Sequence, residues 1–382
     1  MVCDLLFWSK TMRQKMIRGL TALACGVFAL AILLGMLLWV GTPGKTAVTQ
    51  AAGADILDKF DMYMTNTISG ALEGVLSVEK VYWLSDDDLV APEPDPDCYG
   101  ESDDPAQLQW LLDAAAELLD GQETVFSAHT QIKQGSAVTY YLDETIFVVT
   151  WKQAVDKAVY TFSEVKIAHP SQFRRFLSGG EYGSGKLYTT TEMAASVNAV
   201  TASSGDYYSF RPFGFQVYNG TVYRASGSNL DTCFIDENGD LLFVPRETLD
   251  GSGLEQYVEE NNVRFSLSFG PILVQDGQVV FGEYYQLGEV FERYSRAALC
   301  QQGPLHYILV TSNMETPYVE NPYTYTFACR LQEMGIQNAY SLDGGQTAVI
   351  VTGDKLINNV DFGYQRQISD IIYFATAMPD GD

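Results

Sequence analysis

The chain has 382 residues, of which 47% are hydrophobic and 13% aromatic, and it carries a formal net charge of −25. This composition is too apolar for an intrinsically disordered protein. Residues 1–45 hold five Lys or Arg and one Asp, leaving 18 basic against 47 acidic side chains, a net charge of −29, on the remainder. Such a surface repels nucleic acid and anionic lipid, so we expect no nucleic-acid partner. An acidic polymer would need a local basic pocket.

Near the N-terminus, residues 17–40 contain a single charged side chain, Arg18. As a helix this segment would be about 36 Å long, enough to cross a bilayer. Basic residues precede it, which predicts a cytoplasmic tail at residues 1–16 and a cell-membrane protein whose C-terminal domain is extracellular. A cleaved signal peptide is the alternative, although its apolar region is usually only about 7–15 residues long.

Residues 41–125 are expected to form a helical stalk with an acidic, proline-rich linker. Apolar residues recur at helical spacing over 55–84, which predicts one helix. Residues 85–105 are acidic and proline-rich and lack the ligand spacing of a calcium loop, so we expect an extended linker. A second helix is predicted over 105–121, with Asp104 as its N-cap.

From residue 126 to 382 the sequence alternates strand-like segments with turn signals. Asn-Gly or Asp-Gly pairs at 219–220, 238–239 and 276–277 separate candidate strands and indicate hairpins. Two helices are expected, at 190–200 with Thr189 in a capping box, and at 323–335 ending at a glycine. These patterns predict an α+β domain with a mostly antiparallel, hairpin-rich sheet and a few helices.

The cysteines and histidines do not form a recognisable metal or catalytic motif. There is no CxxC pair, the three histidines are scattered, and no metal or cofactor is predicted. Four cysteines beyond the apolar segment either pair as disulfides or are buried thiols, and the sequence leaves this open. These are Cys98, Cys233, Cys300 and Cys329.

A glycine-rich segment at 179–187 is similar to a phosphate-binding P-loop, but Leu187 replaces the Ser or Thr that would bind magnesium. The preceding residues 169–178 have the pattern of a helix or turn and not of a buried strand. We therefore interpret the glycines as loop residues and do not expect a nucleotide site.

Three charged residues stand out as candidates for chemistry. Asp206 follows a run of small residues and precedes two tyrosines, which suits either a pocket carboxylate or a simple turn. Arg296 comes just before an apolar strand, where it could bind phosphate or pair with an acidic neighbour. Asp343 precedes two glycines between apolar runs, which fits either a ligand-binding turn or an Asp-Gly hairpin.

Seven segments between residues 163 and 374 resemble, in order, those of the phosphodiester glycosidase family, whose founding activity removes N-acetylglucosamine from a sugar-1-phosphate diester. Bacterial members of that family are often linked to exopolysaccharides. The segments are PSQFRRFLSGGEYGSG, EMAASVNAVTASSGDYY, GFQVYNGTVYR, LSFGPILVQDG, SRAALC, NAYSLDGGQTAVIV and RQISDIIYF.

Together with the apolar segment at 17–40, this resemblance implies a membrane-anchored hydrolase that cleaves a glycosyl phosphodiester in an envelope or extracellular glycoconjugate. It assigns catalytic roles to Asp206, Asp343 and Arg296, with no metal. It also implies a set of substrate-binding residues: Gly205, Tyr207, Gly344, Gly345, Gln346, Thr347 and Asp370.

The family signature is altered at several positions. Ser204 replaces an Asn, and Gln346, Thr347 and Ala348 replace a Gly-Ser-Ser run. The alternative is therefore a catalytically inactive relative that binds glycans or acts as an envelope scaffold.

Overall fold

The computed structural model describes residues 84–85, 89–129, 137–155, 157–227, 229–280, 292–313 and 320–378. The helices predicted at 17–40 and, apart from Leu84, at 55–84 lie outside these ranges. Within the described ranges, no helix has the length and apolar character needed to cross a membrane. One compact unit comprises Tyr82–Asp382, and the domain boundary predicted at residue 126 falls inside it.

The largest element of this unit is a nine-stranded sheet in which every neighbouring pair is antiparallel. Its spatial order is β1 (Tyr99–Ser102), β2 (Val138–Leu142), β3 (Ile146–Val155), β4 (Ala158–Ile167), β15 (His306–Asn313), β14 (Arg296–Gly303), β16 (Asn338–Leu342), β12 (Ile272–Gln275) and β13 (Gln278–Val279). The mostly antiparallel, sheet-rich α+β architecture predicted from the sequence is thus confirmed for the described residues.

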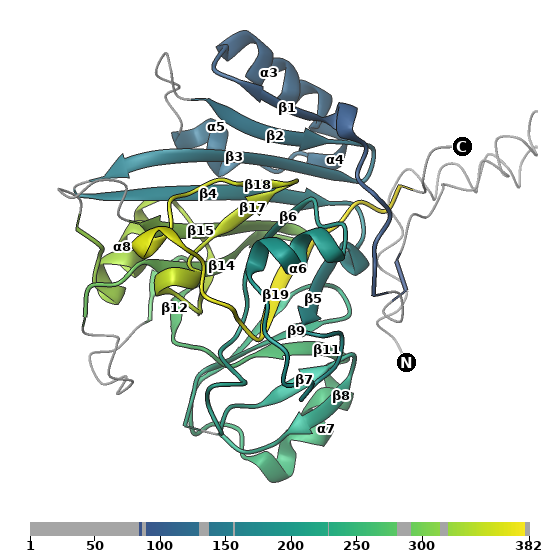
Figure 1. Ribbon diagram of the computed structural model, residues 1–382, viewed down its shortest axis with the longest axis vertical. Helices are drawn as coiled ribbons and strands as arrows, with labels where there is room; N and C mark the ends of the chain where they lie inside the picture. Colours follow the sequence, from purple (N-terminus) through teal and green to yellow (C-terminus); the bar gives the residue numbers. More distant parts are fainter. Residues whose placement is uncertain are drawn as a thin grey trace, which may run out of the picture. The chain divides into compact units, whose positions relative to one another are not determined.

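Both faces of the nine-stranded sheet are buried, and its central strands place apolar residues on each face. Alternate residues of β3 point to opposite faces, with Phe147 and Val149 in one core cluster and Ile146 and Val148 in another. Helices cover the first face (Figure 1): α3 (Pro105–Ala114), α4 (Ala116–Leu119), α5 (Val125–His129) and α8 (Thr324–Glu333).

The second face packs against a five-stranded sheet. Its order is β18 (Lys355–Leu356), β17 (Ile350–Thr352), β6 (Thr201–Ser204), β19 (Asp370–Phe374) and β5 (Phe173–Leu177). Helix α6 (Thr190–Ser196) covers the outer side of this sheet through Met193 and Ala194. The site described below forms at one end of this sheet.

Another five-stranded sheet lies at the lower end of the view in Figure 1. Its order is β10 (Leu241–Val244), β9 (Thr232–Asp236), β11 (Val263–Leu267), β7 (Gln216–Tyr218) and β8 (Thr221–Arg224), and α7 (Leu254–Glu260) packs on it. Short 3-10 helices complete the described elements: η1 (Pro96–Cys98), η2 (Pro170–Gln172), η3 (Gly251–Gly253), η5 (Gly345–Thr347) and η6 (Asp361–Gly363).

Local turn and cap signals in the sequence are confirmed. The three Asn-Gly or Asp-Gly pairs join β7 to β8, β9 to β10 and β12 to β13. Asp104 caps α3 by accepting the Ala106 N–H at 2.9 Å, and Thr189 forms the expected capping box with Glu192. Helix α8 ends just before Gly335, which has a φ of 78°.

Two predictions about local structure are wrong. Residues 173–177, expected as a helix or turn, form the buried strand β5; the pattern was misleading because two adjacent arginines lie inside it. Tyr99–Ser102, expected in an extended linker, forms β1, whose position at the sheet edge leaves it half exposed and therefore tolerant of polar residues.

Smaller differences concern helices and cysteines. The helix expected over 105–121 is split into α3 and α4, and α6 ends at Ser196 instead of residue 200. Helix α7 was not predicted because it has only seven residues. All four cysteines left open by the sequence are free thiols, which selects the buried-thiol alternative for Cys233 and Cys300.

Candidate active site

Asp343 lies where the chain passes from one sheet to another. It follows the last residue of β16 in the nine-stranded sheet, and the next strand, β17, belongs to the five-stranded sheet. The segment is therefore a crossover and not the Asp-Gly hairpin that the sequence left open. A Cβ atom at Gly344 would come within 2.6 Å of the Ser295 carbonyl oxygen, so this glycine allows two backbone segments to touch.

Asp206 and Asp370 meet at the end of two paired strands. Because Ile371 in β19 pairs with Ser204 in β6, the residues that follow β6 lie beside the start of β19. The Asp206 N–H donates to Asp370 Oδ1 at 3.0 Å, and the Gly205 N–H donates to the Asp370 carbonyl at 3.1 Å. A Cβ at Gly205 would lie 2.5 Å from Asp370 Oδ2, so only glycine fits between the two carboxylates.

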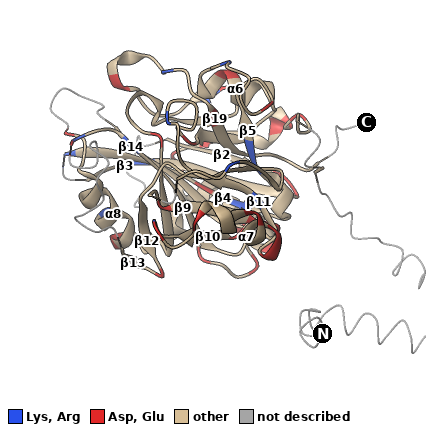
Figure 2. Cartoon of the chain, turned by 90° about the horizontal axis from the view of Figure 1, so that it is seen from below, with Lys and Arg blue, Asp and Glu red and all other residues tan. Residues whose placement is uncertain are grey.

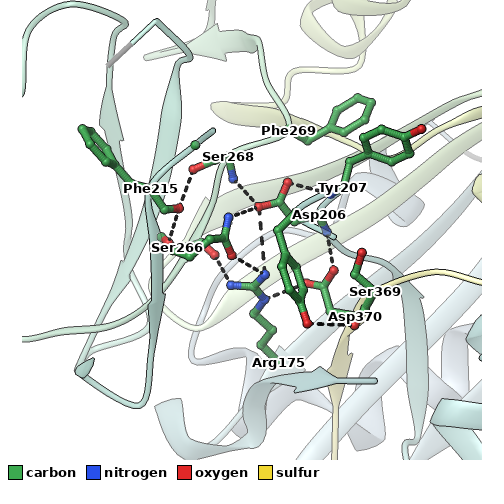
Figure 3. Close-up of polar contacts among 12 residues, drawn as sticks. Arg175, Asp206, Tyr207, Phe215, Ser266, Ser268, Phe269, Ser369 and Asp370 are labelled. Carbon is green, nitrogen blue, oxygen red and sulfur yellow. Dashed lines mark hydrogen bonds and ion pairs between the residues drawn. The ribbon is translucent and has the colours of Figure 1, made fainter. Parts of the chain in front are cut away.

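Arg175 in β5 connects Asp206 and Asp370 to the five-stranded sheet that contains β7 and β11 (Figure 3). Its Nε donates to Asp370 Oδ2 at 2.6 Å, and its Nη2 lies 3.9 Å from Asp206 Oδ2. The remaining donors reach the Ser266 carbonyl at 2.5 Å and Gln216 Oε1 at 3.0 Å. Burial opposes the charge on this guanidinium, but Asp370 and Asp206 outweigh burial and raise the pKa of Arg175.

The Asp206 carboxylate is enclosed by donors from the protein itself. Oδ1 accepts the Tyr207 N–H at 2.7 Å, while Oδ2 accepts Gln216 Nε2 at 2.6 Å and the Ser268 N–H at 2.9 Å. Both Asp206 and Asp370 are buried. Burial raises the pKa of the Asp370 carboxyl to about 7, against the lowering effect of Arg175. This part of the cluster is built to hold the backbone in place.

Asp343 differs from the other two carboxylates because its partner reaches solvent. Arg366 Nη2 donates to Asp343 Oδ2 at 2.6 Å, and the Arg366 side chain is 32% exposed. Burial raises the pKa of Asp343 to about 7, although Arg366 and a hydrogen bond from Thr347 lower it. A carboxyl that titrates near neutral pH suits general acid–base catalysis.

Backbone contacts join Asp343 to the Asp206 pair. The Asp343 N–H donates to the Gly205 carbonyl at 3.1 Å, and Ser204 Oγ donates to the Asp343 carbonyl at 2.7 Å. Asp370 also contributes to raising the pKa of Asp343. The structure therefore brings Asp206, Asp343 and Asp370 into one cluster.

Aromatic and arginine side chains border the solvent side of this cluster. The Tyr207 ring has the guanidinium groups of Arg211 and Arg366 at 5.5 and 5.2 Å from its centre, and Phe210 stacks on it at 4.8 Å. Arg211 also lies 5.2 Å from the centre of the Phe269 ring. A very acidic chain thus places two cations beside a stacking surface, which is a suitable environment for a phosphorylated sugar.

The backbone of Arg296 lies close to the crossover, and its side chain contacts Glu292 and Tyr294. Its Cα would lie 3.7 Å from a Cβ at Gly344. Its guanidinium donates to the Glu292 carbonyl and lies 5.8 Å from the centre of the Tyr294 ring. The described contacts of this side chain are thus made outside the carboxylate cluster, and its catalytic role stays a prediction.

The other predicted substrate-binding residues lie in or beside the crossover. Thr347 Oγ1 donates to the Gly344 carbonyl at 2.8 Å, and Gln346 Nε2 donates to the Tyr364 carbonyl at 3.4 Å. Gly345 has a φ of 66°, which glycine adopts without strain. Among the described residues, no group of three His, Cys, Asp or Glu side chains is placed to hold a metal ion.

Sequence analysis missed three polar members of the site: Arg175, Gln216 and Arg366. Arg175 carried a usable signal, because an arginine between phenylalanines in an apolar segment must find a buried partner. Arg366 opens the RQISDIIYF segment of the family resemblance, but the QRQ triplet that contains it has the composition of an ordinary loop and indicated no role for it.

Comparison with known proteins defines the class of this domain. Residues 193–375 match the family described as phosphodiester glycosidase, which confirms the resemblance found in the sequence. The matched range includes all three aspartates of the cluster and Arg366, whereas Arg175 precedes it.

Individual relatives are distant. The chain is 22% identical over 207 residues to the SPbeta prophage-derived uncharacterized protein YomE of Bacillus subtilis (strain 168), covering 53% of this chain and only 31% of that protein. It also resembles the catalytic domain of zebrafish N-acetylglucosamine-1-phosphodiester alpha-N-acetylglucosaminidase, with 17% identity, a TM-score of 0.51, and coverage of 68% and 92% of the two chains. A hypothetical protein from Synechocystis has a TM-score of 0.49 at 14% identity, over 62% of this chain and 63% of that one. At 17% identity the zebrafish structure supports the fold alone.

Proposed function

We propose that this protein is a hydrolase that cleaves a glycosyl phosphodiester in an envelope or extracellular glycoconjugate, and that residues 17–40 anchor it in the cell membrane. One observation carries the catalytic part. Asp343, a buried carboxyl whose pKa is about 7, is bonded to the partly exposed Arg366 inside a domain of the phosphodiester glycosidase class. The apolar composition of 17–40 supports the anchor.

Arg366 is the group that would receive the phosphate of the substrate. A guanidinium matches two phosphate oxygens at once, and Arg366 can offer donors to solvent while Nη2 holds Asp343. Arg211, on the other side of Tyr207, adds a second positive charge. Phe210, which stacks on the Tyr207 ring and is 41% exposed, offers an aromatic surface to the sugar.

Asp343 would act as the general base. A phosphate monoester is an acidic leaving group that needs charge matching more than protonation, so the harder task is to activate water. In the proposed reaction, water attacks the anomeric carbon and gives its proton to the Asp343 carboxylate. The bond from the anomeric carbon to the phosphate oxygen breaks, and the released phosphate keeps the electron pair beside Arg366.

The test uses the full-length protein in detergent with methyl α-N-acetylglucosaminyl phosphate and matched diesters of other sugars. Asp343→Asn keeps the shape of the side chain and removes the base, so kcat should fall by about 10²–10⁴. Asp354→Asn, the same change at an exposed turn position, serves as the control. Equal turnover by wild type and Asp343→Asn would refute the assignment.

A second candidate is a relative that binds glycans without cleaving them or acts as an envelope scaffold. The enclosure of Asp206 by protein donors supports it, because a carboxylate with every oxygen occupied has little capacity left for substrate. The altered residues Ser204, Gln346 and Thr347 support it as well. Turnover of any diester in the panel by the wild-type protein, lost on Asp343→Asn, would eliminate this candidate.

A further inference from the structure

A loop next to Arg366 presents aromatic side chains to solvent. Phe362 is 87% exposed and Tyr364 is 64% exposed, although both belong to types of residue that are normally at least partly buried. We propose that Phe362, Tyr364 and Phe210 form a stacking platform for an extended anionic glycan, so that the substrate is a polymer. The reaction at Asp343 is taken from the proposed function; the platform itself is an independent binding surface.

The backbone on either side of these aromatic residues is fixed. Asn358 is buried, accepts the Ile350 N–H at 2.7 Å and donates to Asn313 Oδ1 at 2.8 Å. Asp361 accepts Ser295 Oγ at 2.6 Å, and Gln365 Nε2 donates to Thr191 Oγ1 at 2.7 Å. The exposure of the two rings is therefore a property of an anchored loop, and a preorganised surface loses little entropy when it binds a ligand.

Phe362 also adopts a backbone conformation that is unfavourable for a residue with a bulky side chain. The Gly363 N–H donates to the Val360 carbonyl at 2.9 Å and closes a tight turn in which Phe362 has a φ of 61°. Turns of this kind usually place Gly or Asn at such a position. A bulky side chain that is both strained and exposed contributes nothing evident to folding, and strain of this sort is often kept at functional sites.

Backbone contacts connect the segment that carries Phe362 and Tyr364 to the crossover that carries Asp343. The Tyr364 carbonyl accepts Gln346 Nε2 from the crossover, and the Arg366 N–H donates to the Gln346 carbonyl at 3.4 Å. On the other side, the Arg366 guanidinium lies 5.2 Å from the centre of the Phe210 ring, which is 41% exposed. A chain whose sugars stack on these rings would pass Asp343.

The charges around the platform indicate which kind of polymer can bind there. Aromatic rings accept the apolar faces of sugars, and Arg366 and Arg211 favour a polymer with spaced negative charges. Single-stranded nucleic acid also uses aromatic rings and arginines, but it carries one charge on every nucleotide. The chain has 48 acidic against 23 basic residues, and Figure 2 colours acidic residues red at several places along the ribbon; this excess of negative charge disfavours so dense an anion.

The test measures binding of full-length protein in detergent to three probes by affinity electrophoresis and calorimetry. These are a phosphomannan with mannosyl-1-phosphodiester links, a mannan without phosphate, and a methyl mannosyl phosphate. Phe362→Gly removes the ring and suits the left-handed backbone, so loss of binding cannot be attributed to misfolding. We expect it and Tyr364→Ala to weaken phosphomannan binding at least about fivefold relative to the small diester.

Two matched variants complete the design. Phe362→Trp retains an aromatic ring and should keep phosphomannan affinity within about twofold of wild type. Trp110→Ala removes a ring that is 59% exposed from α3, an element outside the site, and should change neither affinity.

Each outcome has one interpretation. An unchanged ratio of polymer to small-diester affinity in Phe362→Gly and Tyr364→Ala would overturn the platform, whether or not Asp343→Asn abolishes turnover. Tighter binding of an oligothymidylate than of phosphomannan would overturn the choice of a glycan. Loss of polymer selectivity in a protein that shows no turnover would support the platform and contradict the proposed hydrolysis.

Discussion

Asp343 is the residue whose protonation should control the reaction. Its pKa is raised to about 7 by burial, so a base at this position is protonated and inactive below that pH. We expect kcat/KM to rise about tenfold per pH unit up to pH 7 and then level off. A pH–rate profile of the full-length protein checks this, and a profile that falls through pH 7 would assign Asp343 as an acid.

Substitution of Arg366 tests independently whether the titration of Asp343 controls the pH–rate profile. Because its guanidinium lowers the pKa of Asp343, Arg366→Gln should move the midpoint of the profile to higher pH, in addition to raising KM for the phosphodiester. An unmoved midpoint would mean that a different group titrates.

Arg175 stabilises the cluster through the geometry of its guanidinium group as well as through its charge. Its planar group serves Asp370, Gln216 and the Ser266 carbonyl in three directions, whereas a lysine has a single ammonium. Arg175→Lys should lower the free energy of unfolding by about 2–4 kcal/mol, measured by urea titration. Arg293→Lys, at an exposed pair with Glu320, should have a much smaller effect because solvent screens that pair. Equal effects of the two changes would show that the cluster does not depend on this geometry.

At the scale of elements, the close approach of β6 and β19 depends on Gly205. Gly205→Ala would push a methyl group against Asp370 Oδ2, and we expect a loss of about 1–3 kcal/mol in unfolding free energy together with reduced kcat. Gly253→Ala is the control, because the nearest atom to its added Cβ, Leu249 Cδ1, lies at an ordinary 3.5 Å. Thermal melts and turnover measured on both variants would separate packing from general glycine effects.

Elements whose signals are local could be predicted from the sequence, and those that depend on distant partners could not. The Asn219-Gly220 turn and the Thr189 cap involve neighbours in the chain and were found correctly. Strand β5 was misassigned because the carboxylates that neutralise Arg175, those of Asp206 and Asp370, lie far along the chain, the second of them 195 residues away. The same limit applies to the site: Asp206 and Asp343 stood out from their neighbours in the sequence and Asp370 was added through a family resemblance, while the role of Arg366 was recognised only from its contact with Asp343.

The whole molecule combines an acidic unit, for which we propose a catalytic function, with a predicted membrane segment. Residues 17–40 lie outside the described ranges, so the anchor stays a prediction. We expect the full-length protein to stay in the membrane pellet after an alkaline carbonate wash, and added protease to digest residues 82–382 in intact cells. Replacing four central leucines or isoleucines of the segment by lysine should release the protein, and recovery of the wild type in the supernatant would contradict the anchor.

The passage of the chain through Asp343, Gly344 and Gly345 from one sheet into the next has a consequence for how the protein matures. The proposed catalytic loop connects two sheets and belongs to neither. A folding intermediate in which both sheets have formed but have not yet packed together would therefore have its full secondary structure and no assembled active site. In a refolding experiment, enzymatic activity would then recover later than the far-ultraviolet circular dichroism signal. The recovery of activity would report the packing of the two sheets against each other, and not the formation of any strand.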